Sequence, residues 1–320
     1  MSRPRVVFMG TPAFAVPALR AVAAACDLVM VVTQPDRPRG RGRVTGESEV
    51  AAEARTLGIE NVLKAEDMKA PEALAALREA RADLFAVVAF GAILTPEALK
   101  VPRLGSINLH GSLLPEYRGA SPVQRALWDG CAGTGVTTLW MDEGIDTGDL
   151  ILQHWEPILP DDDAGSLAIR LAQQGAPLLA VSLTLAAAGR APRIVQDRMS
   201  GSYARKLRKE DGLVNWSVSA VEVWNRQRAV TPWPGAVTWH QGRQLLLTRT
   251  RPAHGLATDA VPGTVIEVGR DAVSVACAPG ALFLERVKPE GRNEMSAADW
   301  ARGSRVSAGE RLMVAKEAEV

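Results

Sequence analysis

The sequence has few cysteines and aromatic residues, and its charges nearly cancel. Its three cysteines, Cys26, Cys131 and Cys277, stand far apart, which argues against a disulfide framework and against a cysteine-type zinc site. Because the net charge is +1, any affinity for nucleic acid must come from local basic patches. No apolar run approaches the ~20 residues of a membrane-spanning helix, and Val6–Met9 is too short for a signal peptide. We therefore expect a soluble, cytoplasmic protein with no membrane partner.

The hydrophobic content of 47% over 320 residues is enough for two folded domains. In residues 1–190, short apolar segments alternate with helical ones. The expected strands are Val6–Met9, Leu28–Thr33, Leu84–Phe90, Ser106–His110, Gly135–Met141 and Ile151–Trp155. This alternation predicts an α/β domain with a doubly wound, mostly parallel, Rossmann-like sheet. Ser166–Ala188 is expected to form a long helix that covers one face of that sheet.

The pattern changes after residue 190. Residues 191–208 form a basic linker, and Asn215–Ala229 is expected to form one helix. Short β segments separated by turn residues then follow, which is typical of a small barrel of the OB type. The sequence therefore predicts a catalytic domain at 1–190, a linker at 191–208 and an OB-like C-terminal domain at 209–320.

Polar side chains stand at the ends of several expected strands. Asn108 and His110 end one strand, Gly91 follows another, and Asp142 and Asp146 follow a third. In open α/β sheets, ligands bind beyond the carboxyl ends of the strands, so these residues are expected to converge. The first strand is not followed by G-x-G-x-x-G, which disfavours a nicotinamide cofactor.

An amide, an imidazole and a carboxylate in one crevice favour acyl transfer. The amide and a protonated imidazole can each donate to a developing oxyanion, and each donor contributes roughly 3 kcal/mol in the transition state. No activated Ser or Cys neighbours Asn108 and His110, so the substrate must bring its own nucleophile, such as an amine. Alternatively, Asn108 and His110 are satisfied strand-end residues, and Asp142 and Asp146 only shape a loop. The acidic segment lacks the spacing of a calcium-binding loop, and no His/Cys ligand set for a metal hydrolase is present, so no metal is expected.

Basic residues gather in three places. They are Arg37, Arg39, Arg41 and Arg43 in a glycine-containing segment, then Arg205, Lys206, Arg208 and Lys209, and finally Arg249, Arg251, Arg286 and Lys288. Flexible Arg/Gly segments suit phosphate contacts at a nucleic acid end. Each cluster alone could equally be a solvated face. A non-catalytic RNA-binding protein is a further alternative, although an idle site has no need for Asn108, His110 and Asp146.

The segment G-S-I-N-L-H-G-S-L-L-P-E-Y-R-G-A-S-P, followed by M-D-E-G-I-D-T-G-D, resembles the folate-dependent formyltransferase family. Four more segments resemble, in order, the opening, the basic loop, the linker and the C-terminal domain of those members that act on a charged tRNA. They are V-V-F-M-G-T-P-A-F-A-V-P, T-Q-P-D-R-P-R-G-R-G-R, Y-A-R-K-L-R-K-E-D-G and R-A-V-T-P-W-P-G-A. The likeness covers nearly the whole chain. It departs at residues 44–49, where Glu47 and Glu49 stand in place of the usual lysines and prolines.

The resemblance implies transfer of a formyl group from 10-formyltetrahydrofolate to the α-amino group of methionyl-initiator tRNA, for translation initiation. The alternative acceptor is a small amine such as an amino sugar or glycinamide ribonucleotide. By the same resemblance, Asn108 and His110 stabilise the oxyanion, while Asp146 orients His110 and helps to receive the amine proton. Arg118 is expected to shape its loop and to meet a carboxylate or phosphate.

The resemblance also assigns binding residues. Those expected to bind the folate are Phe90, Gly91, Ile93, Ser112, Leu113, Leu114, Pro115 and Asp142. Those expected to bind tRNA are Arg37, Arg39, Arg41, Arg43, Lys206, Arg208 and Lys209. A monomer is expected.

Overall fold

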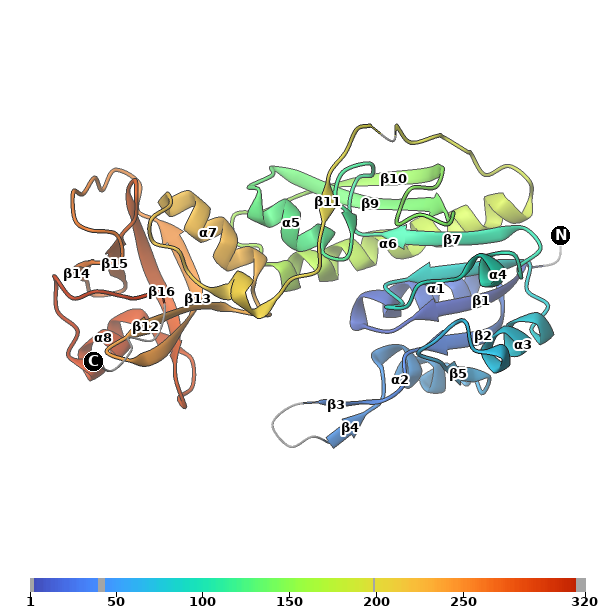
Figure 1. Cartoon of the computed structure of the whole chain (residues 1–320), viewed down its shortest axis with the longest axis horizontal. Coiled ribbons are helices and arrows are strands. Elements are labelled where there is room, and N and C mark those ends of the chain that lie inside the picture. The colour runs from blue at the N-terminus through green and yellow to red at the C-terminus, as the bar shows by residue number, and fades with distance from the viewer. Residues whose placement is uncertain (1–2, 40–43, 198, 315–320) are drawn as a thin grey trace. The chain divides into compact units, whose positions relative to one another are not determined.

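The computed structural model describes residues 3–39, 44–197 and 199–314 (Figure 1). The chain divides into two compact units. The first unit is built from Met1–Pro122, Gly133–Pro157 and Ala168–Ala204, and the second from Val123–Ala132, Ile158–Leu167 and Arg205–Val320. No helix among the described residues is long and apolar enough to cross a membrane.

The first unit contains a seven-stranded sheet. From one edge to the other, its strands are β10 (Leu150–Pro157), β9 (Gly133–Trp140), β7 (Gly105–His110), β6 (Leu84–Val88), β1 (Arg5–Gly10), β2 (Asp27–Thr33) and β5 (Val62–Lys64). The five strands from β7 to β5 are parallel, and β9 and β10 add an antiparallel edge. The predicted doubly wound, mostly parallel sheet is confirmed, and its chain order reverses direction between β1 and β6.

Helices connect these strands. They are the short 3-10 helix η1 (Ala13–Ala15), α1 (Val16–Ala25), α2 (Glu49–Thr56), α3 (Pro71–Glu79), α4 (Pro96–Leu99), α5 (Pro122–Trp128) and α6 (Ala164–Ala187). Helix α6 packs on the sheet: Ser182 Oγ lies 2.8 Å from Thr138 Oγ1, and Gly175 faces Leu109. Because side chains alternate along a strand, Asn108 and His110 project from the face of β7 opposite to Leu109.

Two short strand pairs were not expected from the sequence. Strands β3 (Arg37–Arg39) and β4 (Val44–Gly46) form a hairpin, and β8 (Arg118–Gly119) pairs in parallel with β11 (Tyr203–Ala204). The second pair matters for the site, because it fastens the segment after α6 to the loop that follows β7.

The second unit is a small antiparallel barrel. Its strands are β12 (Ala236–His240), β13 (Arg243–Pro252), β16 (Ala281–Pro289), β15 (Val273–Ala276) and β14 (Val265–Val268), with β17 (Met295–Ser296) beside β16. Its helical segments are η2 (Lys209–Gly212), α7 (Ala220–Ala229) and α8 (Ala297–Ser304). Met313 exchanges backbone hydrogen bonds of 2.8 and 3.0 Å with Trp239, and Glu310 accepts one of 2.8 Å from Val265. The segment 310–313 thereby joins the two edge strands and closes the barrel, as expected from the turn-rich sequence.

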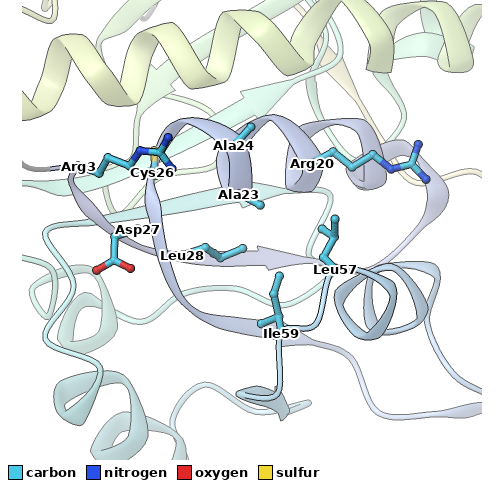
Figure 2. Close-up of a pocket in the computed structure, with 9 residues that line it drawn as sticks. All are labelled: Arg3, Arg20, Ala23, Ala24, Cys26, Asp27, Leu28, Leu57 and Ile59. Carbon is cyan, nitrogen blue, oxygen red and sulfur yellow. The ribbon is translucent and has the colours of Figure 1, made fainter.

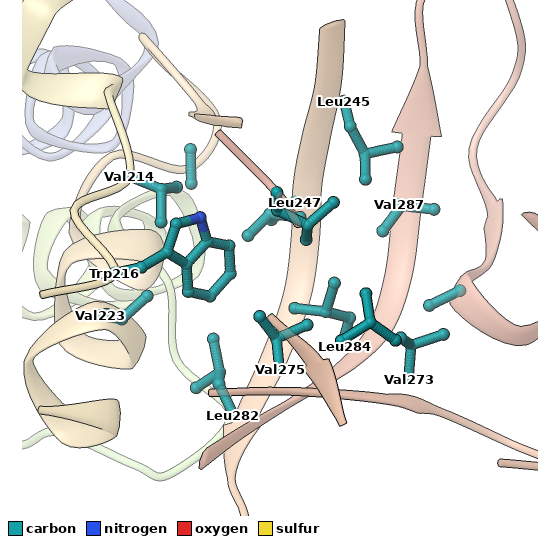
Figure 3. Packing of buried hydrophobic residues seen from close by; sticks show 14 of the residues in the cluster. Val214, Trp216, Val223, Leu245, Leu247, Val273, Val275, Leu282, Leu284 and Val287 are labelled. Carbon is teal, nitrogen blue, oxygen red and sulfur yellow. The ribbon is translucent and has the colours of Figure 1, made fainter. Parts of the chain in front are cut away.

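The barrel encloses an apolar core that includes Trp216 (Figure 3). Trp216 is 2% exposed, and its indole Nε1 donates to Thr238 Oγ1 at 3.2 Å. The predicted start of the helix at Asn215 was wrong, because α7 begins at Ala220. Ser219 caps the helix by accepting from the Glu222 amide at 3.2 Å, while its own amide donates to the Glu222 carboxylate at 3.0 Å. Trp216 is therefore placed in the core by a turn.

Candidate active site

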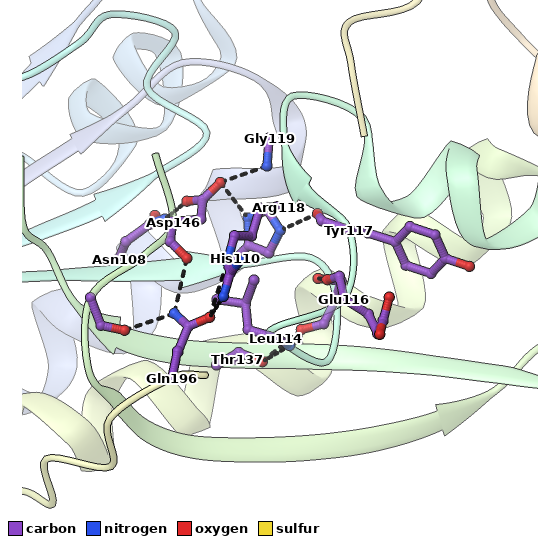
Figure 4. Close-up of polar contacts among 12 residues, drawn as sticks. Asn108, His110, Leu114, Glu116, Tyr117, Arg118, Gly119, Thr137, Asp146 and Gln196 are labelled. Atoms are coloured by element: carbon purple, nitrogen blue, oxygen red, sulfur yellow. Dashed lines mark hydrogen bonds and ion pairs between the residues drawn. The ribbon is translucent and has the colours of Figure 1, made fainter. Parts of the chain in front are cut away.

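The carboxyl end of β7 carries the Asn108 and His110 pair predicted from the sequence (Figure 4). Both side chains project from one face of the strand, two residues apart. Asn108 is half-buried, and the His110 side chain is 7% exposed. The strand thus places an amide and an imidazole side by side at the edge of the sheet where ligands of α/β proteins bind.

Asp146 reaches this pair from the loop after β9. Its carboxylate accepts from Asn108 Nδ2 at 3.1 Å through one oxygen and from the Gly119 amide at 2.8 Å through the other. The second oxygen also lies 3.6 Å from His110 Nδ1. Asp146 has a φ of +55°, a left-handed conformation that favours glycine, so the surrounding contacts must hold it. The structure therefore brings together all three residues predicted to be catalytic.

The contacts of His110 define which atoms carry hydrogen. Its Nε2 lies 2.9 Å from the carbonyl oxygen of Tyr117, and since a carbonyl only accepts, Nε2 carries a proton. Its Nδ1 faces the Asp146 carboxylate. Asn108 Nδ2 has two hydrogens, and among the described residues one of them has a partner.

The turn after His110 is held tightly on β9. Thr137 donates from Oγ1 to the Ser112 carbonyl at 2.7 Å and accepts from the Leu114 amide at 3.1 Å. Ser112 Oγ donates to the carbonyl of Glu116 at 2.6 Å. Ser112 and Leu114 are buried, Leu113 and Pro115 are half-buried, and the Leu114–Pro115 peptide bond is cis. These four expected folate residues thus form one fixed turn beside the three polar residues.

The other expected folate residues differ in what they expose. Phe90 is 2% exposed and its side chain packs in the core, so only its backbone is available to a ligand at the strand end. Gly91 has a φ of +86°, and the Ile93 side chain is 79% exposed. The Asp142 carboxylate accepts from Thr147 Oγ1 at 2.7 and 2.9 Å and from the Gly144 amide at 3.0 Å. Asp142 therefore shapes the loop that presents Asp146.

The predicted tRNA-binding residues fall in two regions. Arg37 and Arg39 lie on β3, whereas Arg41 and Arg43 lie outside the described residues. In the second unit, Lys206, Arg208 and Lys209 are exposed, and no ion pair of their side chains occurs among the residues that the structure describes. We call these three residues the linker cluster.

The third basic cluster is largely neutralised. Arg249 and Arg251 each lie 3.0 Å from the Glu285 carboxylate, and Arg286 pairs with Glu294. Three of the four cations of this cluster are therefore paired with carboxylates, although their side chains are exposed. The pairing could not be read from the sequence, because it depends on which residues face each other across β13 and β16.

Arg118 was expected to shape its loop, and its side chain is held by contacts within the protein. Its guanidinium donates to Gln196 Oε1 at 2.9 and 3.2 Å and to the carbonyls of Ser200 and Asp197 at 3.3 and 3.2 Å. The expectation that it meets a substrate carboxylate or phosphate finds no support in these contacts. Gln196 was missed by the sequence reasoning, since a single glutamine in a linker forms no recognisable pattern.

A separate hollow of about 690 Å³ lies at the opposite end of the strands from the site, near the amino end of β2 (Figure 2). Two of its three charged lining residues are paired: Arg20 lies 2.7 Å from Glu53, and Asp27 lies 3.3 Å from Arg5. Burial raises the pKa of the Cys26 thiol to about 11, which leaves it neutral and unreactive at physiological pH. Asn108, His110 and Asp146 lie instead at the carboxyl ends of the strands. Within the described ranges, no group of three or more His, Cys, Asp or Glu could hold a metal ion.

Comparison with known proteins agrees with this geometry. Residues 5–183 match the formyl transferase family, and residues 206–305 match the formyl transferase C-terminal domain. The chain is 43% identical over 309 residues to the methionyl-tRNA formyltransferase of Geotalea daltonii, covering 96% of this chain and 98% of that one. It is 44% identical over 310 residues to the methionyl-tRNA formyltransferase of Thermus thermophilus, covering 96% and 99%.

The fold is also similar to that of a solved sugar 3N-formyl transferase, WlaRD, with a TM-score of 0.65 and 20% identity, covering 92% of this chain and all of that one. At that identity, the likeness concerns the fold alone. The sequence matches cover both units and include the strand, turn and loop that carry Asn108, His110 and Asp146. This chain belongs to the formyl transferase family.

Proposed function

We propose that this protein transfers a formyl group from 10-formyltetrahydrofolate to the α-amino group of methionyl-initiator tRNA. The observation that carries the proposal is the convergence of Asn108, His110 and Asp146 at the carboxyl end of β7. Relatives that carry the name methionyl-tRNA formyltransferase and match nearly the full chain support the choice of acceptor.

The reaction requires an oxyanion to be stabilised. The amine nitrogen attacks the formyl carbon, and the formyl oxygen becomes anionic as a tetrahedral intermediate forms. Asn108 is suited to donate its second Nδ2 hydrogen to this oxygen while its first stays on Asp146. His110 lies beside it on the same face, and in its protonated form it adds positive charge that favours the anion.

The attacking amine must also lose a proton. The Asp146 carboxylate is the acceptor that the site offers, directly or through one water molecule. The bond from the formyl carbon to N10 of the folate then breaks, and N10 receives a proton in place of the formyl group. The products are formylmethionyl-tRNA and tetrahydrofolate, and no side chain of the protein is acylated.

The turn at Ser112–Pro115, with Phe90, Gly91, Ile93 and Asp142, is proposed to hold the folate. The turn is fixed by Thr137. Gly91 has no Cβ, so a flat ring can approach its backbone closely. The exposed Ile93 offers apolar surface at the same strand end. Asp142 would act through the loop that it stabilises.

The tRNA is proposed to contact the arginines of the β3–β4 region, Arg37, Arg39, Arg41 and Arg43, and the linker cluster. Exposed cations without carboxylate partners are the groups that phosphates bind by releasing counterions. The linker cluster has this property in the described structure. We expect the protein to act as a monomer in the cytoplasm.

A formyl-transfer assay with 10-formyltetrahydrofolate tests the proposal. The acceptors compared are methionyl-initiator tRNA, free methionine and a panel of amino sugars. Product with the charged tRNA alone is the expected result. Product with a small amine and none with tRNA would keep the chemistry but overturn the acceptor, and no product with any amine would overturn the reaction itself.

A further inference from the structure

Gln196 is a buried polar residue that no sequence motif identified. It lies between α6 and β11, after residue 187 and before residue 203, and is 4% exposed. Its side chain contacts two loops that come from distant parts of the sequence, the loop of Asp146 and the loop of Arg118 (Figure 4). Both loops carry groups of the active site.

The amide nitrogen of Gln196 holds the loop of Asp146. Nε2 donates to the carbonyl of Asp146 at 2.9 Å and to the carbonyl of Gly148 at 2.7 Å, so both of its hydrogens are used. The loop is strained and closely packed here: Asp146 has a φ of +55°, and a Cβ at Gly148 would lie 1.8 Å from the Trp140 carbonyl oxygen. Without Gln196, these carbonyls would lose the hydrogen bonds that stabilise this conformation.

The amide oxygen of Gln196 holds the second loop. Oε1 accepts from Arg118 Nη2 at 2.9 Å and from Nε at 3.2 Å. The residues on either side of Arg118 make backbone contacts in the site. The Tyr117 carbonyl faces His110 Nε2, and the Gly119 amide donates to the Asp146 carboxylate. One side chain therefore links the backbone that supports His110 to the backbone that supports Asp146.

We propose that Gln196 is a positioning residue for formyl transfer: it fixes the Asp146 carboxylate against Asn108, His110 and the Gly119 amide. The inference rests on the proposed function for its effect on the reaction. Gln196 acts through Asp146. If the carboxylate moves by about 1 Å, the rate of the chemical step is expected to fall by roughly 10²-fold.

Gln227 provides a matched control. It is 3% exposed, and its Nε2 donates to Thr231 Oγ1 at 3.0 Å and to the Thr248 carbonyl at 3.1 Å. Its Oε1 accepts from Thr250 Oγ1 at 3.1 Å. It thus resembles Gln196 in burial and in hydrogen bonding, but it lies in the barrel unit and none of its contacts involves a residue of the active site.

The test compares Gln196→Met and Gln227→Met in the full-length protein. Both variants remove a buried amide with little change of volume, so both should lower the melting temperature by a few degrees. At saturating concentrations of both substrates, Gln196→Met should lower kcat by roughly 10²-fold, with KM for the folate changed less than threefold. Gln227→Met should leave kcat within twofold. Equal kcat values for the two variants would overturn the proposal.

A second variant and a spectroscopic measurement cover the case in which Gln196→Met does not fold. Gln196→Glu keeps the size of the side chain and the acceptor for Arg118 but removes both donors to the Asp146 loop, so kcat should fall here too. In ¹H–¹⁵N spectra, the Gly119 amide proton should lose the downfield shift that its bond to Asp146 produces, and this shift should persist in Gln227→Met. An unmoved Gly119 signal in Gln196→Glu would overturn the proposal.

The two proposals fail in different ways. If the wild-type protein formylates no charged tRNA, the proposed function fails, but the Gly119 signal still reports whether Gln196 fixes Asp146. If the wild-type protein is active and Gln196→Glu retains its kcat, the positioning role fails while the proposed function stands.

Discussion

The two units of the protein use buried polar groups for different purposes. In the barrel unit, both hydrogens and the oxygen of the Gln227 amide are used in bonds to Thr231, Thr248 and Thr250. In the sheet unit, Asn108 and Asp146 are bonded to each other but are partly accessible at a strand end, and the second Nδ2 hydrogen of Asn108 has no partner among the described residues. Both networks are ordered, but the sheet network leaves a donor for a ligand.

This difference indicates how a reactive network can be told from a structural one. A buried polar group without a partner is costly, so a network that only stabilises a fold tends to satisfy all its members. A catalytic network must hold some hydrogen-bonding capacity in reserve for the transition state. We therefore expect substitutions in the sheet network to affect rate more than stability, and substitutions in the barrel core to do the reverse.

The largest expected effect is on catalysis. Asn108→Ala and His110→Ala each remove a group proposed to stabilise the oxyanion, and each should lower kcat by about 10²–10³-fold. Asp146→Asn keeps the size of the side chain but removes its charge, and it should lower the rate comparably. Steady-state formyl transfer to methionyl-initiator tRNA, with the melting temperature of each variant, provides the measurement. Variants that fold normally and keep full activity would contradict the assignment.

The second effect is on stability and concerns the barrel. Trp216 is 2% exposed and packs against the apolar side chains of Figure 3, so Trp216→Ala should lower the free energy of unfolding by roughly 3–5 kcal/mol. Trp216→Phe should cost less, because it loses the 3.2 Å hydrogen bond to Thr238 and only part of the volume. Urea denaturation measures both. The rate of formyl transfer per folded molecule should be unchanged. A loss of kcat as large as that of Asn108→Ala would contradict the idea that the barrel core affects stability and the sheet network affects rate.

The sequence allowed the sheet and the convergence of Asn108, His110 and Asp146 to be predicted, while their catalytic roles stay a prediction. Apolar segments ended by glycine marked β1 and β7, and Asn108, His110 and Asp146 stood where strands end. Contacts that depend on tertiary structure could not be predicted. Gln196 gave no signal because a glutamine is equally at home on a surface, and the pairing of Arg249 with Glu285 depends on cross-strand register. The start of α7 was misplaced because the apolar spacing of Trp216 continued the helical pattern past its true cap at Ser219.

A third effect concerns binding of the tRNA and compares cations that have a carboxylate partner with cations that have none in the described structure. Replacing Lys206, Arg208 and Lys209 together by Gln should weaken binding of methionyl-initiator tRNA. If each contacts a phosphate, the slope of log affinity against log salt should fall by roughly one for each residue. Arg249→Gln is the control. Because Arg249 is already paired with Glu285 and Asp161, this substitution should leave the slope unchanged. Equal slopes for the triple variant and the wild type would exclude the linker cluster from tRNA binding, while KM for the folate should stay constant throughout.

The smallest expected effect is a dependence of stability on pH that originates in the barrel unit. The pKa of the Asp211 carboxyl is held below its usual range, chiefly by the hydrogen bond from Arg205 at 2.6 Å and also by the Arg208 amide, against the opposing effect of burial. Since the pKa is lower in the folded state, Asp211 stabilises the protein above its unfolded pKa of about 3.9, and this contribution disappears as pH falls through the folded value. The difference in unfolding free energy between wild type and Asp211→Asn should therefore be constant from about pH 7 to pH 5 and shrink below about pH 4. Urea denaturation across this range measures it. A difference that grows toward acid pH would reverse the sign and show that the carboxyl is stabilised in its protonated form.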